Sequence, residues 1–150
     1  MTTIASTRVE SRTLLWKGAG LTAFAAVLFP RINAVIYDDE RIWQLDREAA
    51  VLAPLVVLVA LGVFAAVGVP AWRGAHNRPA RVALVCGVLA VVGVLAYWIS
   101  APIILGGLAV TLGLEGRNRA AEGHRGQAVA GIALGAVAVV LGAVLWFANV

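Results

Sequence analysis

Residues 82–114 read VALVCGVLAVVGVLAYWISAPIILGGLAVTLGL, a run of 33 residues without a charged side chain. A single helix of this length would extend about 50 Å, whereas a bilayer core about 30 Å thick needs roughly 20 apolar residues. Ser100-Ala101-Pro102 offers a break, because a residue before proline avoids the α region and proline suits a first helical turn. We therefore predict two membrane helices, about residues 81–99 and 102–117. They are joined by a tight turn in which Ser100 or Ala101 caps the second helix.

The composition of the whole chain is typical of a membrane protein. Hydrophobic residues make up 61% of the sequence and charged residues 13%, whereas soluble proteins average about 45–50% and about 25%. Residues 49–72 and 127–148 also carry no charge, and each stretch is long enough to cross a bilayer. The basic residues form no stripe with interleaved aromatic residues, so we predict no nucleic-acid partner.

The first apolar segment, residues 14–29, allows two interpretations. It is interrupted by Lys17 and followed by Pro30 and Arg31. It crosses the bilayer if Lys17 snorkels to one interface and the helix continues toward Ile36. It also resembles a signal peptide, because basic residues precede an apolar stretch, although the only candidate cleavage site matches poorly. A retained span and a cleaved signal therefore remain open at this point.

The basic residues predict the topology. They form four groups of three, separated by the predicted spans. Five spans with the N-terminus inside place three groups, nine residues, on the cytoplasmic side and three residues outside, whereas four spans divide the charges six and six. The tendency of basic residues to stay inside favours five spans, with four as the alternative. The groups are Arg8, Arg12 and Lys17; Arg31, Arg41 and Arg47; Arg73, Arg78 and Arg81; and Arg117, Arg119 and Arg125.

This topology divides the chain into three parts. Residues 1–13 form a cytoplasmic tail, residues 14–80 hold two spans, and residues 81–150 form a glycine-rich three-helix membrane domain. The outer loop at residues 37–48 contains five of the eight acidic residues. It is expected to be a solvated connector or a short helix capped by Asp38.

Aromatic residues agree with the predicted topology. Rings with a polar group favour the headgroup level of a membrane. The topology places Trp16 and Trp72 at the inner ends of their spans, and Tyr97, Trp98 and Trp146 at the outer ends.

Glycines concentrate in the C-terminal half, where eleven of the sixteen lie at or after Gly87. Small residues at i and i+4 let helix backbones approach closely in lipid. Gly131 and Gly135 form such a GxxxG motif, and we predict that both face the helix at residues 102–117. Packing within the chain and association with another chain both remain open. The predicted helix-packing residues are Gly106, Gly107, Gly113, Gly131, Gly135 and Gly142.

Three arginines, Arg117, Arg119 and Arg125, lie between the last two predicted spans. Each is a candidate for binding anionic lipid headgroups, at about 1 kcal/mol per residue. The alternative is that the three only fix the topology. His76 and His124 lie on the same side of the membrane and are expected to be solvated, since two lone histidines make a poor metal site.

No motif in the sequence points to catalysis. Positions well inside the predicted spans hold no Asp, Glu, Lys, Arg or His, the residues that mark proton relays and substrate pathways in membranes. No metalloprotease, nucleophile-elbow, P-loop or dinucleotide motif occurs in a suitable setting. Cys86 lies among apolar residues, where a thiol is inert. We therefore predict a non-enzyme with no catalytic residues, no cofactor and no metal site.

Residues 106–119, GGLAVTLGLEGRNR, and 126–135, GQAVAGIALG, resemble a family of small bacterial multi-pass proteins with a domain of unknown function. In that family a glycine-rich hairpin leads through an Arg-rich loop to a final helix beginning G-x-A-x-A-G-I-x-L-G. The resemblance covers about residues 81–145 and implies a bacterial plasma (inner) membrane protein without established chemistry. The matching residues of the final helix are Gly126, Ala128, Ala130, Gly131, Ile132, Leu134 and Gly135.

The sequence thus predicts an all-α protein with five transmembrane helices, the N-terminus inside and the C-terminus outside. The expected function is that of a non-enzymatic scaffold or accessory subunit, which packs against a larger membrane complex through its glycine-rich faces. Its expected partners are membrane lipid and either such a complex or further copies of itself. A small oligomeric channel or transporter is the alternative, and a membrane enzyme comes third.

Overall fold

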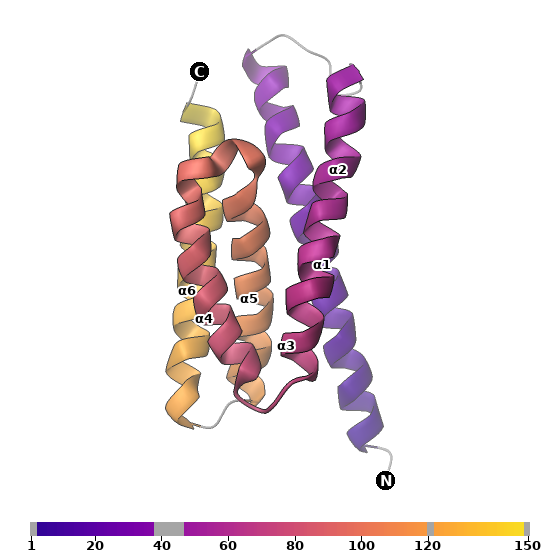
Figure 1. The fold of residues 1–150 in the computed structure, drawn as a ribbon, viewed down its shortest axis with the longest axis vertical. Helices are drawn as coiled ribbons and strands as arrows, with labels where there is room; N and C mark the ends of the chain where they lie inside the picture. Colours follow the sequence, from indigo (N-terminus) through magenta and orange to yellow (C-terminus); the bar gives the residue numbers. More distant parts are fainter. Residues whose placement is uncertain (1–2, 38–46, 120–121, 149–150) are drawn as a thin grey trace.

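The computed structural model describes residues 3–37, 47–119 and 122–148, and all regular elements in these ranges are helical. Five helical segments run alternately up and down, so residues 3 and 148 lie at opposite ends of the bundle (Figure 1). The elements are α1 (Thr3–Tyr37), α2 (Arg47–Val63), a π-helical turn η1 (Phe64–Gly68), α3 (Val69–Arg73), α4 (Arg78–Val92), a 3-10 segment η2 (Gly93–Ile99), α5 (Ala101–Arg119) and α6 (Glu122–Ala148).

Four of the five segments are long and apolar enough to cross a membrane: Thr13–Ile36, Ala50–Arg73, Arg78–Ile99 and Gly123–Ala148. The remaining segment, α5, has 19 residues, about 28 Å of helix. Its last turns carry Glu115, Arg117 and Arg119, which lower its apolar content.

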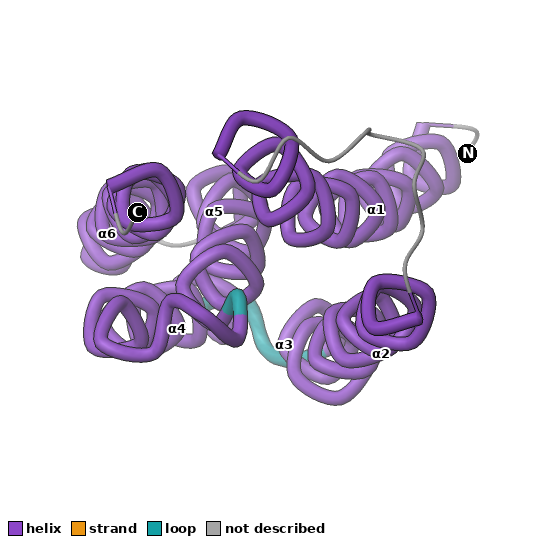
Figure 2. The backbone as a smooth tube through the Cα atoms, turned by 90° about the horizontal axis from the view of Figure 1, so that it is seen from above, coloured by secondary structure: helices purple, strands orange, loops and turns teal. Residues whose placement is uncertain are grey.

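The helix α5 is the centre of the bundle. Seen from above, it lies between α1 on one side and α4 and α6 on the other (Figure 2). Most of its residues are buried, including Ile103, Leu108 and Leu112. Alanines with no exposed surface, such as Ala19, Ala83 and Ala90, line the neighbouring helices. Small side chains at these positions let the neighbouring helices come close to α5, whose large apolar side chains fill the rest of the core.

The predicted break in residues 82–114 lies at Ser100. This residue adopts a left-handed conformation with φ 57°, and its N–H donates to the carbonyl of Tyr97 at 2.9 Å. Its carbonyl accepts from Ile103 and Ile104 at 3.1 and 3.0 Å, which starts α5. Pro102 stands in the first turn of α5, as predicted.

Ser100 stands directly before α5, where a capping residue was predicted, but its hydroxyl donates to the carbonyl of Ala26 in α1 at 3.3 Å. The reason lies in α1, which continues through Pro30. In a regular helix the N–H of residue 30 would donate to the carbonyl of Ala26, but proline has no N–H. A neighbouring hydroxyl can satisfy such a freed carbonyl inside a membrane. Ser100 therefore compensates for Pro30 and connects α5 to α1.

We expect this compensation to be measurable in a double-mutant cycle. Ser100→Gly accepts the left-handed conformation but leaves the Ala26 carbonyl without its donor, which should cost about 1–3 kcal/mol. In a Pro30→Ala background the new backbone N–H donates to that carbonyl. The same substitution should then cost clearly less stability. Thermal unfolding in detergent measures both losses. Equal losses in the two backgrounds would contradict the proposed link between Ser100 and Pro30.

Helix ends differ from the sequence prediction. The first helix begins at Thr3 rather than near residue 14. The last begins at Glu122 rather than at residue 127, since hydropathy detects the apolar part of a helix and misses polar turns that extend beyond it. Most of the short helix considered for residues 38–48 lies outside the described residues, and its last two positions belong to α2, which starts at Arg47.

Candidate functional site

Three of the predicted helix-packing glycines, Gly106, Gly113 and Gly135, lie where the backbones of α5 and α6 nearly touch. A Cβ added at Gly106 would stand 2.6 Å from the carbonyl oxygen of Gly135, and one added at Gly135 would stand 2.7 Å from that of Gly106. At Gly113 it would meet the carbonyl oxygen of Ala128 at 2.9 Å. Real Cβ atoms do not approach backbone so closely, hence α5 and α6 keep this spacing only with glycine at the contacts.

The GxxxG motif of α6 contacts two different helices. Gly135 lies against α5, whereas a Cβ at Gly131 would meet the carbonyl carbon of Ala83 in α4 at 2.6 Å. The prediction that both glycines face the helix at residues 102–117 is therefore wrong for Gly131. The i and i+4 positions of a helix are separated by about 40° around its axis, enough for one to face α4 and the other α5. Gly142 lies further along α6, against Pro102.

A second pair of small-residue motifs joins α1 to α5. Thr111 of α5 fills the space above Gly18 of α1, and Thr22 of α1 fills the space above Gly107 of α5. The Thr111 hydroxyl donates to the carbonyl of Gly107 within its own helix at 2.8 Å. Sequence reasoning missed Gly18 in this role. The i, i+4 spacing of Gly18 and Thr22, repeated by Gly107 and Thr111, is the signal that could have found the contact.

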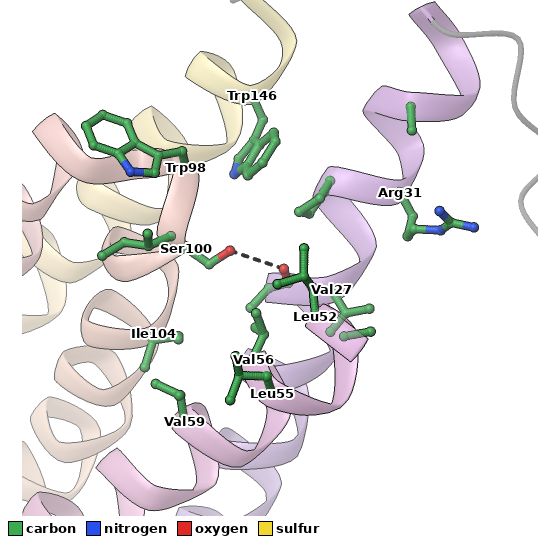
Figure 3. A pocket seen from close by; sticks show the side chains of 15 residues that line it. Val27, Arg31, Leu52, Leu55, Val56, Val59, Trp98, Ser100, Ile104 and Trp146 are labelled. Carbon is green, nitrogen blue, oxygen red and sulfur yellow. Dashed lines mark hydrogen bonds between the residues drawn. The ribbon is translucent and has the colours of Figure 1, made fainter. Parts of the chain in front are cut away.

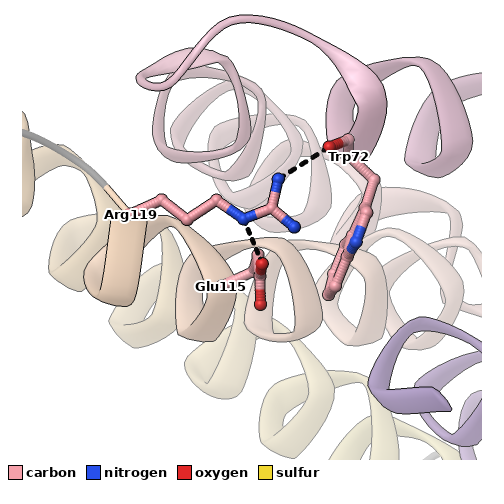
Figure 4. A network of polar contacts seen from close by, with 3 residues as sticks. All are labelled: Trp72, Glu115 and Arg119. Atoms are coloured by element: carbon pink, nitrogen blue, oxygen red, sulfur yellow. Dashed lines mark hydrogen bonds and ion pairs between the residues drawn. The ribbon is translucent and has the colours of Figure 1, made fainter. Parts of the chain in front are cut away.

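At the end of the bundle where α3 and α5 terminate, Arg119 of α5 contacts α3 (Figure 4). Its guanidinium forms an ion pair with Glu115, one turn back in α5, and donates to the carbonyl of Trp72 in α3 at 2.9 Å. The guanidinium carbon also lies 5.3 Å from the centre of the Trp72 ring, within the range of a cation–π contact. Glu115 is 5% exposed, so Arg119 supplies the counter-charge of a buried carboxylate.

The three arginines predicted to bind headgroups therefore have different environments. Arg117 and Arg125 are exposed on the surface, while the contacts of Arg119 include buried groups of the protein. Arg81 at the start of α4 lies 3.2 Å from the imidazole Nε2 of His124 in α6. His76 is exposed.

Trp72 is also buried rather than exposed at a headgroup level. It is 5% exposed and packs in a cluster with Leu15, Phe64 and Leu108. In contrast, Trp16 and Trp98 are 50% and 61% exposed. At the other end of the bundle, Tyr97 forms edge-to-face contacts with Trp98 and Trp146 at 5.6 and 5.9 Å between ring centres. Tyr97, Trp98 and Trp146 thus form one connected aromatic group.

A cavity of about 570 Å³ lies at the same end, between α1, α2 and the turn at Ser100 (Figure 3). Its wall is mostly apolar. Leu52, Leu55 and Val59 of α2 form one side and are 48–54% exposed, so the cavity is open laterally. The sequence did not predict this cavity, because it arises from the separation of α2 and α5 in space.

The described residues contain no cluster of three or more His, Cys, Asp or Glu side chains that could hold a metal ion. Cys86 is a free, buried thiol in α4. Comparison with known proteins found no matching family model, no matching curated protein and no matching solved structure. The packing core of α4, α5 and α6, the Arg119 contact and the lateral cavity are therefore the features from which a function is argued.

Proposed function

We propose that the chain is a non-enzymatic scaffold or accessory subunit of a bacterial plasma membrane, crossing the bilayer five times with its N-terminus inside. The alternating direction of the five helical segments supports an odd number of crossings, since residues 3 and 148 lie at opposite ends (Figure 1). The division of the basic residues, nine inside and three outside, supports this orientation. The bacterial membrane follows from the family resemblance of residues 81–145.

The observation that carries the scaffold role is the interlocking of α4, α5 and α6. Each pair of these helices meets at glycine residues. The helices α5 and α6 meet at Gly106 and Gly135, and α4 and α6 meet at Gly87 and Gly131. A Cβ at Gly116 of α5 would meet the backbone nitrogen of Ala80 in α4 at 2.8 Å. Backbones in such contact cannot slide past one another without a clash. The three helices therefore behave as one rigid body, which suits a scaffold.

The glycine faces are occupied within the chain, so a partner is expected to bind elsewhere. The span Ala50–Arg73 has the smallest buried share of the four candidate spans. Its outward residues Val51 and Leu58 are both 66% exposed. A partner helix that packs on α2 would leave the rigid three-helix body undisturbed. We therefore place the partner contact at α2 instead of the glycine-rich faces.

Purification of a tagged copy from native membranes in mild detergent tests this role. We expect a stoichiometric complex with a larger membrane protein. A photo-crosslinker at Leu58 should join the two chains, while one at Val140, exposed on α6, should not. A homogeneous homo-oligomer without a partner would overturn the accessory role and favour the small channel or transporter instead.

The orientation is tested separately by cysteine labelling. Cys86 is the one cysteine in the sequence, so Cys86→Ala gives a cysteine-free background. In that background we expect Arg125→Cys to react with a membrane-impermeant maleimide only after the cells are opened. Asp39→Cys, in the outer loop, should react in intact cells whose outer barrier is permeable to the reagent. The reverse pattern would contradict the proposed orientation.

A further inference from the structure

The second span contains a backbone carbonyl without a helical donor, at Ala65 in η1. In a regular helix the N–H of Val69 would donate to it, but in this π turn that N–H donates to the carbonyl of Phe64, five residues back. The next N–H in the same register would belong to residue 70, which is Pro70 and has none. Within the part of the chain that the structure describes, no side chain donates to the Ala65 carbonyl.

This carbonyl faces lipid in the proposed membrane embedding. Ala65 is exposed on the surface of the bundle, and the second span lies at the edge of the bundle (Figure 2). Ala65 stands eight residues before Arg73, the inner end of the span, which is about 12 Å along a helix. Water is absent at that depth, and an unsatisfied carbonyl in lipid is strongly unfavourable. The carbonyl therefore needs a donor from outside the chain.

The same chain already shows which donor suits such a carbonyl. Pro30 frees the carbonyl of Ala26 inside the first span, and the hydroxyl of Ser100, from another helix, donates to it at 3.3 Å. Serine and threonine hydroxyls form such hydrogen bonds between membrane helices. By the same chemistry, a hydroxyl on a neighbouring helix would satisfy Ala65.

The surface around Ala65 gives a helix access to its backbone. Val51, Leu58 and Ala65 follow at intervals of seven residues, so they share one face to within about 20° per interval. Gly62 is exposed beside them, and a Cβ added there would meet no atom within 4 Å. This is the face of α2 on which we place the partner. None of the four residues lines the lateral cavity, so the two features of the span are separate.

The hydroxyls of this chain argue for a different protein rather than a second copy. Thr22, Ser100 and Thr111 are 94–98% buried, as their exposed fractions of 6%, 2% and 6% show. Thr13 is exposed but is the first residue of its span. Among the described residues, no serine or threonine well inside a span is thus free to reach a second molecule.

We propose that the partner helix carries a serine or threonine whose hydroxyl donates to the carbonyl of Ala65, in the inner half of the bilayer. The inference rests on the proposed accessory role and deepens it by naming the chemistry of the partner. It predicts that this chain selects a helix with a hydroxyl at that depth over a purely apolar helix.

Val69→Thr tests the free carbonyl by supplying a hydroxyl within the chain. A threonine donates to the carbonyl four residues back, which here is that of Ala65. We expect the dissociation constant of the purified complex to rise about threefold to tenfold, the effect of one interhelical hydrogen bond. Val57→Thr is the control, because Val57 is also half-buried on α2 but lies in regular helix, where the carbonyl four residues back is already paired.

A second matched pair restores the missing N–H itself. Pro70→Ala supplies a backbone donor next to the π turn, so the helix can satisfy its own carbonyls and the partner should again bind severalfold more weakly. Pro54→Ala is the control. Pro54 frees the carbonyl of Ala50, but Ala50 is the first residue of the span, where water reaches it. We expect Pro54→Ala to leave the dissociation constant unchanged.

Thermal unfolding of the chain alone in detergent gives a readout without the partner. Val69→Thr should be more stable than Val57→Thr, because only Val69→Thr satisfies an unpaired carbonyl. Equal stability of the two would show that the Ala65 carbonyl is already paired and would overturn the proposal.

Two results with the complex would also overturn it while leaving the accessory role intact. One is equal affinity of Val69→Thr and Val57→Thr for the partner. The other is a partner whose membrane spans contain no serine or threonine. A complex that is missing altogether, or a homo-oligomer in its place, would instead overturn the accessory role and the inference with it.

Discussion

Replacing Gly131 by alanine is expected to destabilise the protein by about 1–3 kcal/mol, the usual cost of overpacking. The added methyl group would lie 2.6 Å from the carbonyl carbon of Ala83 and 2.8 Å from the nitrogen of Leu84. Both are backbone atoms of α4, so no side-chain rotation can relieve the clash. The helices must separate, which also disturbs the neighbouring contact of Gly87 with Gly131. Thermal unfolding in detergent should show a midpoint lowered by several degrees.

Gly126→Ala in the same helix provides the control. Gly126 is exposed, and a Cβ there meets no atom within 4 Å. Alanine is favoured over glycine inside a helix by up to about 1 kcal/mol, so this substitution should be neutral or slightly stabilising. The difference in stability between the two variants then measures the effect of the close approach of α4 and α6. If Gly131→Ala were as stable as Gly126→Ala, the interlocked three-helix body would be refuted.

Much of this fold could be predicted because its strongest signals are local in the sequence. Charge-free runs locate the helices, and Pro102 locates the break that the left-handed Ser100 provides. The direction in which a glycine faces is a tertiary property. A GxxxG motif shows that a helix has a small face, but it does not say which neighbour lies there. The prediction that Gly131 faces the helix at residues 102–117 was therefore wrong, although the motif itself was recognised.

The remaining features depend on residues that are distant in the sequence. Arg119 was grouped with Arg117 because both belong to one short basic cluster, yet Arg119 contacts Trp72, 47 residues away. The hydroxyl of Ser100 reaches Ala26 across 74 residues. The lateral cavity exists because α2 packs on α1 and diverges from the other helices, a relation between elements that hydropathy does not encode. Sequence patterns predicted the segments, and packing determined which polar groups meet.

Arg119→Leu is expected to cost about 3–5 kcal/mol, the effect of removing one partner of a buried ion pair. It leaves the carboxylate of Glu115, a residue 5% exposed, without its counter-charge. It also removes the hydrogen bond to the Trp72 carbonyl and the contact with the Trp72 ring. Thermal unfolding in detergent measures the loss. Arg117→Leu is the control, because Arg117 is exposed two residues away and should change stability by no more than about 0.5 kcal/mol.

The double variant Glu115→Leu/Arg119→Leu separates the two interpretations of Arg119. If the ion pair is internal, removing both charges should restore part of the stability lost in Arg119→Leu, since no buried charge remains. If Arg119 instead serves anionic headgroups, removing Glu115 should restore nothing, and the cost of Arg119→Leu should depend on the phosphatidylglycerol content of the membrane. The Glu115 ion pair predicts the first pattern for Arg119. For Arg117 and Arg125, which point to the surface, we expect the dependence on anionic lipid.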